Sequence, residues 1–277
     1  MTIAPADFAY VRELVHRRSA IALEAGKEYL VESRLLPIAR ASGEGSLDRL
    51  VSRLRSSPEG ALHQQVVEAM TTNETSWFRD RHPYESLESV ILPDLLPRRA
   101  MERKLVIWSA AAATGQEAYS IAMVLHDRLA ADPTWNLRVL ATDLSEEMVR
   151  RTRAGRYSQL EINRGLPAAK LVRHFTRAGT DWLVNEPLRR MVEARQLNLA
   201  APFPPLPPVD VLFLRNVLIY FKLDTRRQIL DRVRRVLRPD GYLVLGGAEN
   251  ILNVDAFECV PLDKATVYRP RGGQAAT

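Results

Sequence analysis

The sequence predicts an α/β protein: a Rossmann-like domain preceded by a small all-helical domain. From Val106 onward, apolar runs of strand length alternate with amphipathic stretches of helix length, as in successive β-α-β units. In the first third, apolar residues recur at helical spacing instead. We therefore expect a helical domain over 1–92, a linker over 93–104 and the α/β domain over 105–270, followed by a disordered tail over 271–277.

The first third carries apolar stripes that indicate a small helical bundle. Ser57-Pro58 is typical of an N-cap followed by a first-turn proline. The stripes are Phe8, Val11, Leu14 and Val15, then Leu47, Leu50, Val51 and Leu54. Arg49 and Arg53 lie one turn apart opposite the second stripe, with Arg55 nearby, so they form either a local basic face or ordinary solvated positions.

The most informative stretch is 106–123, where an apolar strand passes through small residues and one glycine into a helix that ends near Leu129. Small side chains from Ala111 to Gly115 let a ligand approach the backbone, and the helix N-terminus offers free N–H donors. The stretch lacks both the three-glycine dinucleotide loop and the Gly-Lys-Ser/Thr of NTPases. An adenosine ligand without pyrophosphate, such as S-adenosylmethionine, fits this pattern.

A second strand, 137–143, ends in Asp143, and Ser145 can cap the next helix. In a right-handed β-α-β unit this carboxylate lies beside the first loop and can accept both hydroxyls of a ribose. The alternative is that Asp143 only favours the start of the helix.

A third apolar strand from Val209 runs into Arg215 and Asn216, which should face the same crevice. A helix over about 224–237 follows. Pro239 and Gly241 end it, and 242–249 supplies another strand.

Together these segments resemble the chemotaxis-receptor methyltransferase (CheR) family. The motifs occur in family order over nearly the whole chain: Thr-Thr-Asn-Glu-Thr-Ser-Trp-Phe-Arg-Asp at 71–80, then 108–123, 141–145, Arg-Asn-Val-Leu-Ile-Tyr-Phe at 215–221, and 241–249. The resemblance implies S-adenosylmethionine-dependent O-methylation of glutamate side chains, with S-adenosylhomocysteine as product. The implied partner is the cytoplasmic coiled coil of a chemoreceptor, and the implied state is a monomer.

The chain departs from the family pattern in the first loop, where it has Ala112, Ala113 and Gln116. It retains the second acidic position, Glu117. That carboxylate is either an acceptor for polar groups of the cofactor or an ordinary acid of the first helical turn.

The resemblance also implies which residues form the site. The loop with Asn73, Thr75 and Arg79 lies over the cofactor, and Arg79 and Tyr220 are the expected catalytic residues. Arg79 would orient the incoming carboxylate; alternatively, it is only a surface arginine with no role in the site. Tyr220 would position the methyl donor; alternatively, its ring is only buried at the end of the strand. The full set of expected cofactor-binding residues is Asn73, Thr75, Arg79, Gly115, Glu117, Asp143, Asn198, Leu199, Arg215 and Asn216.

The family inserts a β subdomain that we expect at about 178–197. Some members capture a pentapeptide tether of the receptor there through a glycine-marked loop. This chain keeps only Gly179 of those glycines, which predicts that it works without the tether. A basic helix of the small domain contacts the receptor in the family, which assigns docking to Arg49, Arg53 and Arg55.

Composition limits the other function classes. Basic and acidic residues balance through Lys104, so the net charge of +6 arises after it, on segments patterned as amphipathic helices. We expect no nucleic-acid partner, because no Asp/Asn-Pro-Pro-aromatic motif follows the 209–214 strand. The single cysteine, Cys259, excludes a disulfide framework, and we expect no metal, no membrane insertion and a cytoplasmic protein. A noncatalytic adaptor that keeps the fold is the remaining alternative.

Overall fold

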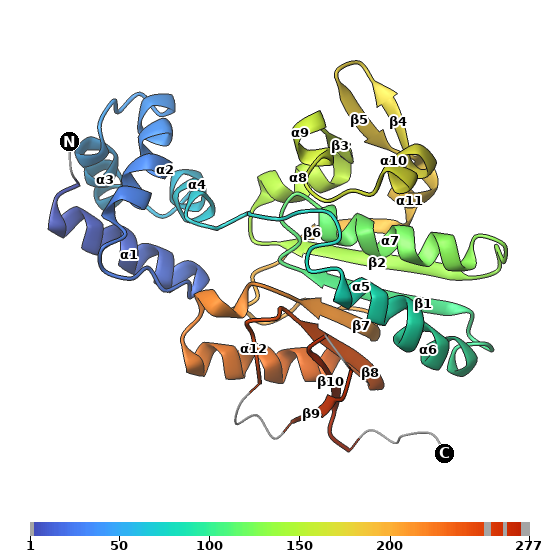
Figure 1. Cartoon of the computed structure of the whole chain (residues 1–277). Helices are drawn as coiled ribbons and strands as arrows, with labels where there is room; N and C mark the ends of the chain where they lie inside the picture. Colours follow the sequence, from blue (N-terminus) through green and yellow to red (C-terminus); the bar gives the residue numbers. More distant parts are fainter. Residues whose placement is uncertain (1–2, 252–255, 263–264, 273–277) are drawn as a thin grey trace.

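The computed structural model describes residues 3–251, 256–262 and 265–272. A helical bundle, blue in Figure 1, lies beside a larger α/β part, and the chain crosses between them after α4. No helix among these residues combines the length and the hydropathy that a membrane crossing requires.

Four helices form the predicted bundle, although the stripes did not indicate the second: α1 (Pro5–Ser19), α2 (Glu28–Ala41), α3 (Leu47–Ser56) and α4 (Ala61–Ala69). The predicted N-cap at Ser57-Pro58 is wrong, because Ser57 is the C-cap of α3 and α4 begins after Gly60. The predicted stripes are buried in one shared core, with Val31 and Leu35 of α2 between them. Pro5 occupies the first turn of α1, where its missing N–H costs no hydrogen bond.

A seven-stranded sheet forms the centre of the α/β part, in the order β6-β2-β1-β7-β8-β10-β9. Five neighbouring strands run parallel, and β10 pairs antiparallel with both β8 and β9. Their bounds are β1 (Lys104–Ala110), β2 (Asn136–Asp143), β6 (Val192–Gln196), β7 (Val209–Leu214), β8 (Leu237–Leu245), β9 (Phe257–Val260) and β10 (Val267–Pro270). The chain order changes direction between β1 and β7, so the crevice of this open sheet lies above their carboxyl ends.

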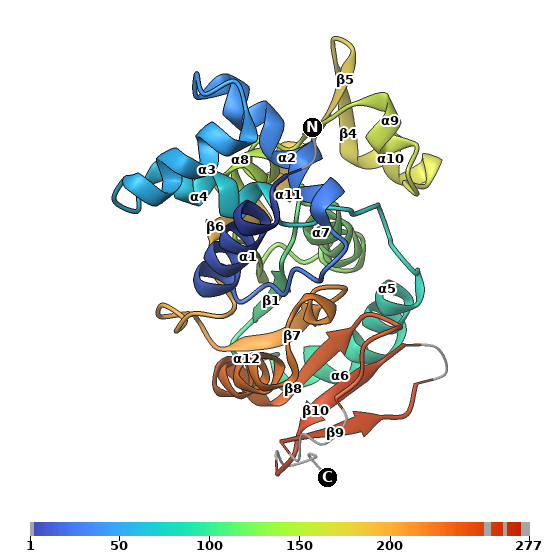
Figure 2. The same ribbon diagram turned by 90° about the vertical axis from the view of Figure 1, so that its left-hand side faces the viewer.

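Helices cover both faces of the sheet (Figures 1 and 2). Ile107 belongs to the core under α7 (Gln116–Leu129), and Trp108 belongs to the core under α12 (Leu223–Val236). Alternate residues of one strand point to opposite faces, which explains why β1 is apolar from Leu105 to Trp108. A further helix, α8 (Glu146–Ala154), packs on β2 and β6.

The predicted linker over 93–104 is wrong. Residues 82–98 form α5 (His82–Ser86), a π-helical turn η1 (Leu87–Ile91) and α6 (Leu92–Arg98), which pack on the sheet core. Arg99 is buried and pairs with Asp210 at 2.6 Å and Asp240 at 2.7 Å. These contacts fasten the segment to the α/β part, so the helical domain ends near α4 rather than at residue 92.

The inserted subdomain also differs from its expected bounds. Its sheet has the order β3-β5-β4 and begins at β3 (Arg156–Tyr157), whereas β6 belongs to the main sheet. The other strands are β4 (Phe175–Ala178) and β5 (Asp181–Val184), and the helices are α9 (Gln159–Ile162), α10 (Ala168–His174) and α11 (Glu186–Met191).

Two further boundaries shift. The structure continues β8 through Pro239 to Gly241, because α12 already ends at Val236. At the end of the chain, residues 271–272 form a turn after β10, and 273–277 lie outside the described residues, so they do not test the predicted disorder.

Candidate functional site

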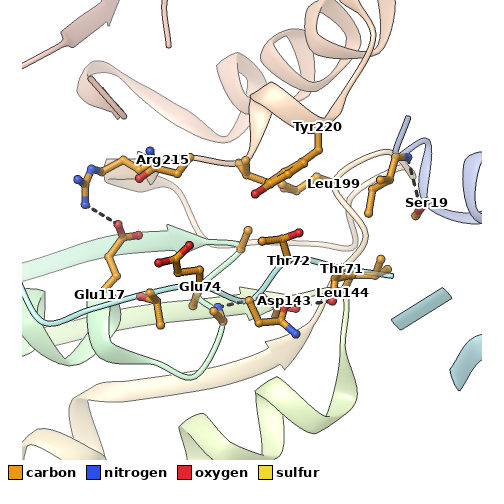
Figure 3. Close-up of a pocket in the computed structure, with 18 of the residues that line it drawn as sticks. Ser19, Thr71, Thr72, Glu74, Glu117, Asp143, Leu144, Leu199, Arg215 and Tyr220 are labelled. Carbon is orange, nitrogen blue, oxygen red and sulfur yellow. Dashed lines mark hydrogen bonds and ion pairs between the residues drawn. The ribbon is translucent and has the colours of Figure 1, made fainter. Parts of the chain in front are cut away.

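A cavity lies at the carboxyl ends of β1, β2 and β7, between the sheet and the helical bundle (Figure 3). Together with its open mouth it encloses about 940 Å³ of space between the two domains. The segment between α4 and α5 passes over it, and Thr71 to Thr75 form part of its wall.

The loop after β1 forms the floor of the cavity. Ala111 to Ala113 line it, and Ala111 and Ala113 adopt φ angles of 58° and 49°. Asp143, at the end of β2, accepts hydrogen bonds from the N–H of Ala113 at 2.9 Å and of Ser145 at 2.9 Å. Burial raises the pKa of this carboxyl, while the two N–H donors oppose the rise. Asp143 thus both organises the turn and faces the cavity.

Gly115 does not line the cavity, contrary to the prediction. It forms the N-cap of α7 with a φ angle of 93° and faces the subdomain. A Cβ there would lie 2.8 Å from Thr152 Oγ1 and 3.0 Å from the Tyr157 hydroxyl. Glycine is therefore required for close packing, and the small residues that let a ligand approach are the three alanines.

Arg215 and Glu117 form a buried ion pair at one end of the cavity (Figure 3). Their atoms Nη1 and Oε2 are 2.9 Å apart, and Glu117 also accepts from Ser109 Oγ at 2.8 Å. Arg215 Nη2 donates to Asp80 at 2.7 Å and to the carbonyl of Arg79 at 2.9 Å. Burial raises the pKa of Glu117, and the Arg215 guanidinium opposes that rise.

Glu117 and Arg215, both predicted to contact the cofactor, therefore also stabilise the protein itself. Glu117 and Arg215 line the cavity, but each is already bonded within the protein. The Nε atom of Arg215 is also buried and has no hydrogen-bond partner among the described residues.

The segment after β7 depends on a residue that sequence reasoning missed. The Glu249 carboxylate accepts from the backbone N–H groups of Asn216 at 2.7 Å, Val217 at 2.9 Å and Leu218 at 2.8 Å. It thereby holds Asn216 at a φ angle of 56° in the cavity wall. Its position at the end of the predicted 242–249 strand was the available signal.

The loop over 71–80 is anchored at its far end, as its aromatic residues suggest. Trp77 is buried and donates from Nε1 to the carbonyl of Glu161 at 3.0 Å, while the Phe78 N–H donates to Ser120 Oγ at 3.1 Å. Asn73, Thr75 and Arg79 all line the cavity. The Arg79 guanidinium donates only to the carbonyl of Glu74, at 3.1 Å, among the described residues.

The opposite wall joins the two domains. Tyr220, in the 3-10 turn η2 (Leu218–Tyr220), is half-buried and points toward the cavity, and its carbonyl accepts from the Ala22 N–H at 2.9 Å. Asn198 donates to the carbonyl of Arg18 at 2.8 Å, and the adjacent Leu199 is a lining residue. The bundle adds Ser19, Ile21 and Met70, which no sequence motif indicated.

The three docking arginines of α3 do not share one face. At about 100° per residue, Arg49 and Arg53 lie within one sector, whereas Arg55 lies about 160° from Arg53. Arg55 contacts Asp7 at 3.1 Å and the Tyr10 ring, so it holds α3 to α1. Arg53 pairs with Glu44 at 2.8 Å, and Arg49 forms no ion pair within the described chain. The predicted basic face is therefore reduced to Arg49 and Arg53, away from the cavity.

The lining suits an adenosine-type cofactor that bears a carboxylate. Ile21, Leu197 and Leu199 supply apolar wall for a flat ring, and Asp143 supplies an acceptor for hydroxyl groups. The guanidinium of Arg79, which lines the same cavity, supplies a donor for an anionic group.

Comparisons with known proteins agree with this geometry. Residues 73–266 match the CheR methyltransferase, SAM binding domain, and residues 6–71 match the CheR methyltransferase, all-alpha domain. Chemotaxis protein methyltransferase 1 of Pseudomonas aeruginosa is 39% identical over 98% of this chain and 100% of its own length. Cher2 of Pseudomonas putida is 38% identical with the same coverage, and the Escherichia coli chemotaxis protein methyltransferase is 34% identical over 92% of this chain and 88% of its own. The chain therefore belongs to the CheR methyltransferase family, with an all-α domain followed by an S-adenosylmethionine-binding domain.

Proposed function

We propose that this chain is a cytoplasmic protein-glutamate O-methyltransferase that forms methyl esters on the coiled coils of chemoreceptors. Family membership supports an S-adenosylmethionine-dependent methyltransferase of chemotaxis. The glutamate ester, the coiled-coil substrate and the docking mode are the parts that this proposal adds.

The observation that carries the proposal is the kind of charged group in the cavity. Three carboxylates line the cavity, and each already has a partner: Glu117 is paired with Arg215, Asp143 is bonded to backbone N–H groups, and Glu74 pairs with Arg164 at 3.3 Å. None of the described residues that line the cavity is histidine, cysteine or lysine. An amine or hydroxyl acceptor needs a base to remove its proton, whereas a glutamate carboxylate is already ionised and nucleophilic at neutral pH.

The residues of this chain then act by alignment. Arg79, on the loop across the cavity, orients the incoming carboxylate by a charge-assisted hydrogen bond. Tyr220 on the opposite wall bounds the path of the methyl group, which the cofactor supplies already activated on sulfur. Holding oxygen, carbon and sulfur nearly in line while excluding water is the main catalytic contribution.

The decisive experiment incubates the protein with S-adenosylmethionine carrying a labelled methyl group and purified receptor cytoplasmic fragments. We expect label that is released by mild base, as for an ester. Base-stable label would show a different acceptor, and cofactor binding without transfer would favour the adaptor. Saturating S-adenosylhomocysteine should raise the unfolding midpoint, since a ligand at one hundred times its dissociation constant adds about 2.7 kcal/mol.

We also propose that docking does not need the receptor's pentapeptide tether. The β4–β5 hairpin turns through one glycine, Gly179, and β4 offers a free edge of only four residues. Titration of the free pentapeptide into the protein should give no heat of binding, and micromolar affinity would contradict the proposal.

Direct docking through Arg49 and Arg53 has a separate test. Arg49→Glu should slow methylation of receptor fragments and leave cofactor affinity unchanged, with a larger effect at low salt because exposed charges are screened over about 10 Å at 0.1 M. Arg150→Glu on α8 is the matched control. Equal rates for the two variants would remove α3 from the docking surface.

A further inference from the structure

Three potential metal ligands meet outside the cavity, at the junction of α7 with the inserted subdomain. His126 and Asp127 lie in the last turn of α7, and His174 ends α10. One ligand atom from each lies within 4.8 Å of the other two. No sequence motif indicated this cluster, because only the fold brings His174 close to His126.

Three polar atoms of this cluster make no well-aligned hydrogen bond. His126 Nδ1, Asp127 Oδ1 and His174 Nε2 are all buried without a hydrogen-bond partner. His174 is only 2% exposed, and its Nε2 lies 3.0 Å from Asp127 Oδ1, although the two atoms are not aligned for a hydrogen bond. Buried polar atoms without partners are rare and call for an explanation such as an ion.

Two cations also contact Asp127, one at each carboxylate oxygen. Lys170 Nζ bonds Oδ2, the oxygen that faces away from the histidine contact. Such an outer contact orients a ligating carboxylate. Arg173 Nε lies 3.0 Å from Oδ1, but its side chain is 57% exposed and can turn into solvent.

We propose that His126, Asp127 and His174 bind one divalent transition-metal ion, with zinc as the best match. Two imidazoles and one carboxylate form a common zinc ligand set, with water in the fourth position. Calcium and magnesium prefer oxygen ligands throughout. The bound ion would fasten the subdomain to α7, whose N-terminal end reaches the cavity.

The test uses the full chain without an affinity tag, carrying Cys259→Ser so that the exposed thiol cannot bind zinc. After treatment with a chelator, calorimetric titration with zinc chloride should show one site, and zinc should raise the unfolding midpoint. Cobalt chloride should give the intense visible absorption of a four-coordinate ion.

Ligand variants separate this site from adventitious binding. His126→Gln and Asp127→Asn should each weaken zinc binding by more than about tenfold, the loss that even an outer-shell change can bring. His126 is only half-buried, so its variant should still fold, which unfolding midpoints without metal will verify. His16→Gln on α1 is the control and should bind as the parent does. Absence of zinc binding by the parent, or equal affinity in all variants, would overturn the proposal.

Discussion

The guanidinium of Arg215 donates a hydrogen bond to the backbone carbonyl of Arg79 at 2.9 Å. A side chain at the end of β7 thereby fixes the position of the loop that crosses the cavity. The same guanidinium pairs with Glu117 on α7. The wall of the cofactor cavity and the expected acceptor-orienting residue are thus held by one buried group.

Arg215→Met should destabilise the protein by about 3–5 kcal/mol, because it leaves the buried Glu117 carboxylate without its partner. Urea unfolding measures the change. Adding Glu117→Gln should recover part of the loss, since the uncompensated charge is then removed. A single-variant loss below about 1 kcal/mol would contradict the structural role of the pair.

Asp143→Ala should weaken S-adenosylhomocysteine binding by about 1–3 kcal/mol, because hydroxyl groups of the ligand lose a charged acceptor. Calorimetry measures the affinity. Ser145→Ala is the control: it removes the α8 cap, in which Ser145 Oγ accepts from the Met148 N–H, and costs about 1 kcal/mol of stability. If both variants kept full affinity, Asp143 would act only at the start of the helix.

Cofactor affinity should fall as the pH is lowered, and the midpoint of this fall should lie at a higher pH than the pKa of an exposed aspartate. Burial raises the pKa of Asp143 above 3.8, and only the ionised carboxylate accepts two hydroxyls. For folding the sign is opposite: the raised pKa contributes stability below 3.8 that is lost as pH rises through the folded-state value. Titrations from pH 7 downward test the affinity, and Asp143→Asn should flatten the profile. An unchanged profile in that variant would assign the pH dependence elsewhere.

Arg79→Ala should reduce methyl transfer far more than stability, because among the described residues its guanidinium makes a single hydrogen bond, to the carbonyl of Glu74. Transfer rate and unfolding midpoint must be measured together. Arg150→Ala, which removes an exposed pair with Glu147 on α8, should change neither. Full activity of the Arg79 variant would exclude this residue from the site.

Gly115→Ala should destabilise the protein by more than about 2 kcal/mol, since it adds a clash with Thr152 to the strain of a positive φ angle. Gly179→Ala is the matched control: its φ angle is also positive, at 69°, but a Cβ there meets nothing within 4 Å. The control should lose about 1 kcal/mol. Equal losses would mean that packing at Gly115 contributes nothing.

The sequence by itself determined that the first third is a helical bundle, that β1, β2, β7 and β8 are strands, and that Asp143, Arg215 and Asn216 lie at one edge of their sheet. These features follow from local patterns: periodicity reports which face of an element is buried, and polar residues at the carboxyl ends of parallel strands must meet. The motifs at 71–80 and 215–221 predicted the CheR family and S-adenosylmethionine as cofactor, and the match to the CheR SAM-binding domain confirmed both predictions.

Only the tertiary structure decided the partners of the charged groups. Arg99, in the segment expected as a linker, pairs with Asp210 and Asp240, and Asp80 meets Arg215 from 135 positions away. Gly115 proved to be a packing residue and Arg55 an anchor of the bundle. The sequence alone does not show whether a carboxylate or guanidinium is solvated, paired within the protein or free to bind a ligand. Its role depends on which distant segments of the chain surround it in the fold.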